Sequence, residues 1–139
     1  MTERREPSFR GLVAWQKADE LASLVFKTVD TFAPRHRWLA LQAARAAVSV
    51  AANIAEGYGR GSLGDYVRFL DIARGSLAEV EYYVYFFARE GLVTETTGKE
   101  LVQVQAEASR VLRGLTLATR RKTKDEWDRA GGGRNTPNC

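Results

Sequence analysis

Six polar side chains between positions 42 and 60 recur at spacings of three and four residues, which places them along one side of a helix. They are Gln42, Arg45, Ser49, Asn53, Glu56 and Arg60. Asn53 and Glu56 could hydrogen-bond a ligand, but the stripe holds no partner base to complete a catalytic set. A polar seam in an otherwise apolar helix can also fix which helices pack together. We expect this structural role, with a ligand or phosphate contact as the alternative; the seam is Gln42, Ser49, Asn53 and Glu56.

The segment Gly57-Tyr58-Gly59-Arg60-Gly61-Ser62 follows the stripe and has the glycines and the arginine of a phosphate-binding loop. A dinucleotide-binding fingerprint needs a preceding strand, and a P-loop needs Lys followed by Ser or Thr; the segment has neither. A glycine turn between two helices, with Ser62 as the N-cap of the second, explains the same composition. We expect such a turn, at which a backbone phosphate could still dock.

Residue types that carry metal and nucleophilic chemistry are scarce in this sequence. The chain has one histidine, His36, and one cysteine, Cys139. A di-iron bundle needs Glu-x-x-His pairs, and no glutamate stands at the matching position before His36. A hydrolase that used Glu56 would lack a partner base or a metal. We therefore expect no catalytic residue, no metal site and no cofactor, so the protein is predicted not to be an enzyme.

Positive charge collects in two parts of the sequence. The net charge is +4 and the pI is about 9.5, which favours an anionic partner. The first group of cations lies late in the chain: Arg110, Arg113, Arg120, Arg121, Lys122 and Lys124. The second group lies on and around the polar stripe: Arg35, Arg37, Arg45 and Arg60. We expect both groups to contact nucleic-acid phosphates. Cations also suit a helix C-terminus, so a solvated helix end is the alternative for the first group.

Apolar residues at helical spacing predict the elements that position these side chains. Four helices are expected, at about residues 12–32, 37–58, 62–90 and 95–122. Pro34 and Gly91 mark two of the helix ends. Short connections between long helices favour an antiparallel, up-down-up-down four-helix bundle, which is an all-α fold. One apolar stripe of the second helix is assigned to Leu41, Ala44, Val48, Ala51 and Ala55.

The chain ends are expected to lie outside the bundle, which would occupy residues 11–122. Residues 1–10 read as an N-terminal arm, and residues 123–139 as a flexible, disordered basic tail. Trp127 in that tail is either a docking residue for another protein or a ring that packs back onto the bundle. The start of the chain lacks a signal peptide, and no apolar run is expected to span a membrane. A cytoplasmic protein without a membrane partner is predicted.

Two surfaces exceed what one bundle core can bury. The run Tyr82-Tyr83-Val84-Tyr85-Phe86-Phe87 places large rings on every side of its helix. The helix at 37–58 is rich in alanine, so its backbone can approach a neighbour on more than one face. Self-association would bury both surfaces.

Several blocks of sequence stand in a recognisable order. They are Phe9 and Leu12–Ala18; Gln42, Arg45, Ala46 and Ser49; Asn53–Arg60; Phe69, Leu70 and Ala73; Gly75–Leu77; and Glu79–Glu81. Together they resemble the four-helix bundle family named for proteins encoded in intervening sequences of large-subunit ribosomal RNA genes. The resemblance covers about residues 9–120, and it departs where Ala51-Ala52 replaces a proline-containing pair. The accessory variability protein of diversity-generating retroelements is similar in a looser way.

The resemblance implies a homopentamer, in agreement with the surplus aromatic and alanine surfaces. The retroelement protein it extends to is a basic pentameric barrel that works with a reverse transcriptase and nucleic acid. We predict a non-enzymatic oligomeric binding module that presents basic surface to structured RNA or to an RNA-protein complex. The alternative is a protein-interaction scaffold, or an accessory factor that docks a reverse transcriptase in a retroelement.

Overall fold

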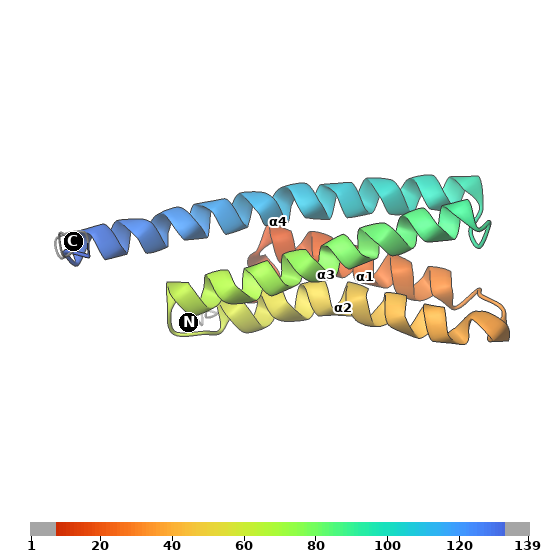
Figure 1. The fold of residues 1–139 in the computed structure, drawn as a ribbon, viewed down its shortest axis with the longest axis horizontal. Coiled ribbons are helices and arrows are strands. Elements are labelled where there is room, and N and C mark those ends of the chain that lie inside the picture. The colour runs from red at the N-terminus through yellow and green to blue at the C-terminus, as the bar shows by residue number, and fades with distance from the viewer. Residues whose placement is uncertain (1–7, 133–139) are drawn as a thin grey trace, which may run out of the picture.

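The computed structural model describes residues 8–132, which form an antiparallel bundle of long helices (Figure 1). The helices are α1 Val13–Val29, α2 Arg37–Tyr58, α3 Leu63–Arg89 and α4 Glu95–Arg129. Each helix packs against its neighbours in sequence, and α1 also packs against α4. Within the described residues no Cα atoms of α1 and α3, or of α2 and α4, lie within 8 Å of each other, so each of these two pairs lies on a diagonal of the bundle. The predicted all-α, up-down-up-down four-helix fold is confirmed.

The connections between the helices are short because the sequence caps the helix ends. The Ser62 hydroxyl accepts a hydrogen bond from the Asp65 backbone N–H at 3.1 Å and so caps α3, as predicted. The Thr94 hydroxyl caps α4 in the same way through the Thr97 N–H. Gly91 adopts a φ of 69°, a conformation that side chains disfavour, and it ends α3. The Ser62 cap therefore lies in the α2–α3 connection, and Gly91 and Thr94 shape the α3–α4 connection.

The first helix is shorter than predicted, because α1 ends at Val29 and not at residue 32. Its last carbonyls are met by a turn, in which the backbone N–H of Thr31 donates to Thr28 and that of Phe32 donates to Val29. Proline disfavours helical backbone at the preceding residue, and a 3-10 turn, Pro34–His36, then leads into α2. A second 3-10 turn, Phe9–Gly11, precedes α1.

The apolar stripe that the sequence predicted for α2 is only partly buried. Ala51 is in the core, but Leu41 and Val48 are 49% and 52% exposed, so they face solvent. The core face of α2 consists of Leu39, Ala43, Ala46, Ala47, Val50, Ala51, Ile54 and Gly57. Apolar residues of α2 recur at helical spacing on two faces, so periodicity alone could not choose between them. The face with more small residues is buried, because alanine lets α1 and α3 approach closely.

The last helix continues beyond the position where a tail was expected. Residues 123–129 belong to α4, so the prediction of a disordered tail beginning at residue 123 is wrong for this stretch. Thr123 is half-buried, and every residue from Lys124 to Ala130 is exposed. In Figure 1 the end of α4 extends past the other three helices. Intrahelical hydrogen bonding sustains this extension, since the stretch contains neither proline nor glycine. The rest of the predicted tail, 133–139, and most of the predicted arm, 1–7, lie outside the described residues.

One segment changes the expectation about membranes. Residues 34–58 are long and apolar enough to span a bilayer, by length and composition alone. In the bundle this segment packs against α1 and α3, which is how the core helix of a bundle meets the same criterion. It also carries Arg37, Arg45 and Glu56.

Candidate nucleic-acid interface

The charges of α4 are separated along its length. Residues 95–107 carry Glu95, Lys99, Glu100 and Glu107, and residues 110–124 carry six cations and no acid. All six of these cations are exposed: Arg110, Arg113, Arg120, Arg121, Lys122 and Lys124. The basic half belongs to the C-terminal part of the helix, where positive side chains are favoured by the helix dipole. The late group of predicted cations therefore forms one continuous helical segment.

A groove of about 380 Å³ lies between this basic half of α4 and α3. Its charged and polar lining consists of Arg74 and Glu81 from α3 and Gln105, Ser109, Arg113 and Arg120 from α4. The sequence analysis had named Arg113 and Arg120 but missed Arg74. Arg74 follows Asp71 by three residues, which looks like an ordinary helical ion pair. Only the packing of α3 against α4 shows that three arginines share one groove.

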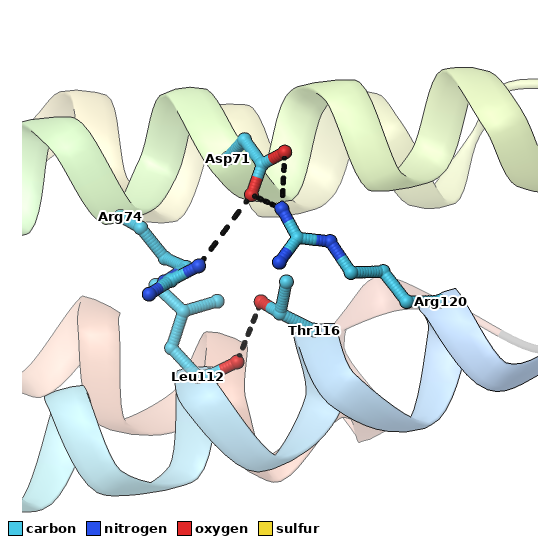
Figure 2. Close-up of polar contacts among 5 residues, drawn as sticks. All are labelled: Asp71, Arg74, Leu112, Thr116 and Arg120. Carbon is cyan, nitrogen blue, oxygen red and sulfur yellow. Dashed lines mark hydrogen bonds and ion pairs between the residues drawn. The ribbon is translucent and has the colours of Figure 1, made fainter.

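Asp71 holds two of the three arginines (Figure 2). Arg120 reaches from α4 to both carboxylate oxygens, with its Nη2 at 2.7 and 2.8 Å. Arg74 approaches from the same helix as Asp71, with its Nη1 3.6 Å from Oδ1. Arg113 has no ion-pair partner within residues 8–132. The groove thus combines one unpaired and two partly neutralised guanidinium groups, each with donors for a phosphate.

Threonines bring α4 close to α3 beneath this cluster. Thr116 is 1% exposed, and its hydroxyl donates to the Leu112 carbonyl at 2.8 Å, as Figure 2 shows. Thr119 is also buried and bonds Leu115 at 2.8 Å. These bonds satisfy the hydroxyl donors without a partner on another helix. The buried face of α4 therefore carries small threonines whose hydroxyls bond their own helix, while Arg113 and Arg120 stay at the surface.

The early group of predicted cations does not join the α4 segment within one protomer. Arg35 and Arg37 stand at the start of α2, at the end of the bundle that also holds the α3–α4 turn (Figure 1). Arg45 lines a separate groove of about 270 Å³ between α2 and α3, together with Glu79. Because α2 lies diagonally across from α4, these side chains lie apart from the basic half of α4.

Arg60 belongs to a third place, the turn between α2 and α3. Its Nη2 lies 2.9 Å from the Glu56 carboxylate, and its guanidinium sits 4.8 Å from the centre of the Phe69 ring. Arg68, which the sequence analysis missed, lies at the same distance from that ring. Gly57 is buried where a Cβ atom would stand 2.7 Å from Phe69 Cβ. The glycine therefore serves close helix packing, and no feature of the turn points specifically to a phosphate cradle.

Members of the polar seam bond across the α2–α3 interface. The hydroxyls of Ser49 and Ser76 lie 2.9 Å apart, and the Asn53 amide donates to the Ser49 carbonyl and hydroxyl. The Tyr83 hydroxyl lies 3.1 Å from Oε1 of Gln42 and 3.0 Å from Glu79. Burial, followed by the Glu79 carboxylate, raises the pKa of Tyr83. These contacts support a role of the seam in pairing α2 with α3. That the seam has this structural role, and does not contact a ligand or a phosphate, stays a prediction.

Metal-ligand types do not gather anywhere in residues 8–132: no three His, Cys, Asp or Glu side chains stand close enough to hold an ion. His36 is the residue before α2 and makes no capping hydrogen bond with its side chain. Cys139 lies outside the described residues.

Comparisons with known proteins agree with this fold. The family model described as "23S rRNA-intervening sequence protein" matches residues 10–114. A solved structure of a protein of unknown function from the S23 ribosomal protein family of Bacteroides thetaiotaomicron superimposes with a TM-score of 0.69. It is 22% identical, and the alignment covers 75% of this chain and 95% of the other, so the likeness shows the fold alone. No curated protein matches the chain.

Proposed function

Because the chain belongs to the 23S rRNA-intervening sequence protein family, we propose that it is a non-enzymatic, cytoplasmic RNA-binding protein that contacts phosphates of structured RNA. The single observation that supports this most is the basic half of α4, with six cations and no acid over residues 110–124. Such a segment attracts a polyanion and releases its counterions on binding. Phosphate contacts of this kind position the protein on RNA and discriminate little between sequences.

The groove between α3 and α4 supports a defined phosphate contact within that surface. Arg74, Arg113 and Arg120 approach it from two helices. The helix contacts hold the two backbones in place, so the guanidinium groups need not be gathered at binding. A phosphate seated there would contact Arg113 first, because Asp71 already engages the other two.

We further propose that the protein assembles with itself through the outward face of α2. Trp38, Leu41 and Val48 are exposed on this helix. Isolated apolar residues are ordinary on a surface, but three on one helix form the kind of patch that a second protomer covers. In the predicted pentamer each protomer would add its own cations, so assembly would multiply the basic surface. Replacing Leu41 and Val48 by Glu should lower the mass in sedimentation analysis, whereas an unchanged mass would place the interface elsewhere.

The test of the function is RNA affinity over a salt series. The wild-type protein should bind a hairpin RNA with an affinity that falls steeply as the salt concentration rises. The slope of log affinity against log salt should be about one for each phosphate contacted, because each contact releases about one counterion. Arg113→Gln should weaken binding and make the salt dependence shallower by about one such unit. Lys99→Gln is the matched control, since Lys99 is on the acidic half of the same helix and pairs with Glu95 at 3.1 Å. Equal losses in both variants would count against a site at the groove.

The second candidate is a protein-interaction scaffold, for which the exposed apolar residues of α2 are again the motivating observation. In that case the assembly would dock a polymerase, such as a reverse transcriptase, and touch nucleic acid only secondarily. An intact oligomer that fails to bind RNA even at low salt would favour this candidate over RNA binding.

A further inference from the structure

The basic stripe of α4 ends in an exposed aromatic ring that phosphate contacts alone do not explain. Arg113, Arg120, Lys124 and Trp127 are separated by seven, four and three residues. On a helix with 3.6 residues per turn these spacings keep the four side chains within one narrow stripe. With a rise of 1.5 Å per residue, the stripe extends about 21 Å along the helix. It therefore carries three cations followed by one indole.

Trp127 is 63% exposed although it belongs to a helix. It lies on the part of α4 beyond the bundle, where no residue from 124 to 130 is buried (Figure 1). A large ring that is held open to solvent outside the core contributes little to folding. Its exposure leaves a flat apolar surface next to Lys124 and Arg120.

The end of α4 restrains this ring. Gly131 adopts a φ of 83°, and the Gly132 N–H donates to the Trp127 carbonyl at 3.0 Å. This turn brings the backbone at Gly132 against the indole, where an added Cβ atom would overlap the ring. The ring is thus held against the chain at Gly132 while most of its surface stays open to solvent. A restrained ring loses less conformational entropy when a flat ligand stacks on it.

We propose that this stripe binds unpaired RNA, with phosphates on Arg113, Arg120 and Lys124 and one unpaired base stacked on Trp127. This inference rests on the proposed RNA-binding function and adds the class of RNA. Bases in a duplex are stacked on one another, so their faces are closed to a side chain, whereas a single strand offers them. A positive groove that ends in an aromatic platform is the arrangement by which proteins hold single strands.

The carboxylates around the stripe leave two of its three cations unpaired. Asp71 of α3 engages Arg120, whereas Arg113 and Lys124 have no ion-pair partner within the described residues. Successive residues of a helix turn by about 100°, so Asp125 and Glu126 point away from the side that Trp127 occupies. Asp128 lies nearer the stripe, and no ion pair to Lys124 forms within the described residues. The family match ends at residue 114, so most of the stripe, Trp127 included, lies beyond the residues that the family model covers.

The test compares a short unstructured RNA oligomer with a duplex of the same length, at one salt concentration. Trp127→Ala should weaken binding to the single strand about tenfold, the loss of one stacked base, and leave duplex affinity unchanged. Trp127→Phe should retain most of the single-strand affinity, because a ring remains. Val102→Ala is the control, because Val102 is an apolar side chain that is 53% exposed on the acidic half of α4, outside the stripe.

Four outcomes separate the inference from the function on which it rests. Selective loss in Trp127→Ala, with Val102→Ala unchanged, supports both. Unaltered single-strand affinity in Trp127→Ala overturns the stacking inference and leaves RNA binding in place. Equal losses on single strand and duplex also overturn it, since they would indicate a general effect on α4. A wild-type protein that binds neither RNA at low salt overturns the proposed function together with the inference. Because Trp127 is outside the core, thermal unfolding should be the same in all variants.

Discussion

Nη2 of Arg120 donates hydrogen bonds to both carboxylate oxygens of Asp71, and this contact joins α4 to α3. The same carboxylate lies 3.6 Å from Nη1 of Arg74. One acid therefore offsets the charge of two of the three arginines that line the groove. It follows that Asp71 should oppose the binding of a phosphate while it orders the side chains that would receive it.

Asp71→Asn should strengthen RNA binding roughly threefold at low salt, because two guanidinium groups lose a competing anion. Its effect on folding should be small, at most about 0.5 kcal/mol, since the pair is more than two-fifths exposed. Glu95→Gln is the control, as it removes a charge of the same sign at the other end of α4. Filter binding and chemical denaturation measure the two effects. An equal gain in both variants would show that only total charge matters.

α2 and α3 approach each other closely at Gly57, where a Cβ atom would stand 2.7 Å from Phe69 Cβ and 3.0 Å from Tyr66 Cδ2. Gly57→Ala should therefore lower the free energy of unfolding by about 1–3 kcal/mol, the usual cost of overpacking. Gly114→Ala is the matched comparison, because Gly114 lies within α4 with open space at its Cβ position. It should stabilise by about 0.5–1 kcal/mol through helix propensity. Urea unfolding measures the stability of both variants. A Gly57→Ala protein as stable as wild type would contradict the close contact of Gly57 with Phe69 and Tyr66.

The fold could be predicted because helix periodicity, glycine and proline placement and short connections all indicate the same bundle. What periodicity could not decide is which of two apolar faces points inward. In α2 it selected Leu41 and Val48, and burial selected Ala43 and Ala47 instead. In α4 the core includes Gln105, Thr116 and Thr119, which no hydrophobic pattern would choose. The hydroxyls of Thr116 and Thr119 can be buried because each donates a hydrogen bond to a carbonyl of the same helix.

The candidate site was predictable in part for the same reason. A run of cations is visible in the sequence, so the basic half of α4 could be named. The groove depends on which side chains of α3 face α4, and that required the packing; Arg74 was missed because its neighbour Asp71 suggests a local pair. The cations of α2 were grouped with those of α4 by charge alone, although the two helices lie on a diagonal.

The hydrogen bond between Ser49 and Ser76 links α2 to α3 at 2.9 Å. Ser76→Ala should lower the free energy of unfolding by about 1 kcal/mol, because Ser49 loses its partner on the other helix at a half-buried position. Ser23→Ala on the exposed side of α1 is the control and should change stability by less than about 0.5 kcal/mol. Thermal and urea unfolding provide the comparison. Indistinguishable stabilities would mean that the seam contributes nothing to the pairing of α2 with α3.

Tyr66 is the described residue whose buried side-chain oxygen has no hydrogen-bond partner. Tyr66→Phe should therefore leave stability at neutral pH unchanged or raise it by about 1 kcal/mol, since an unpaired polar atom is removed from the interior.

The same substitution should change the response to alkali. Burial is the main cause that raises the pKa of Tyr66 above its ordinary value of 10.0, and nearby Tyr58 adds to it. Above pH 10 the unfolded chain loses this proton while the folded chain keeps it, so stability is full below pH 10 and falls as the pH rises towards the folded pKa. Urea unfolding at a series of pH values should show a shallower alkaline decline in Tyr66→Phe. Part of the alkaline loss of stability should remain in Tyr66→Phe, because burial and Glu79 also raise the pKa of Tyr83. An identical decline in wild type and Tyr66→Phe would indicate that the Tyr66 hydroxyl is solvated in the folded protein.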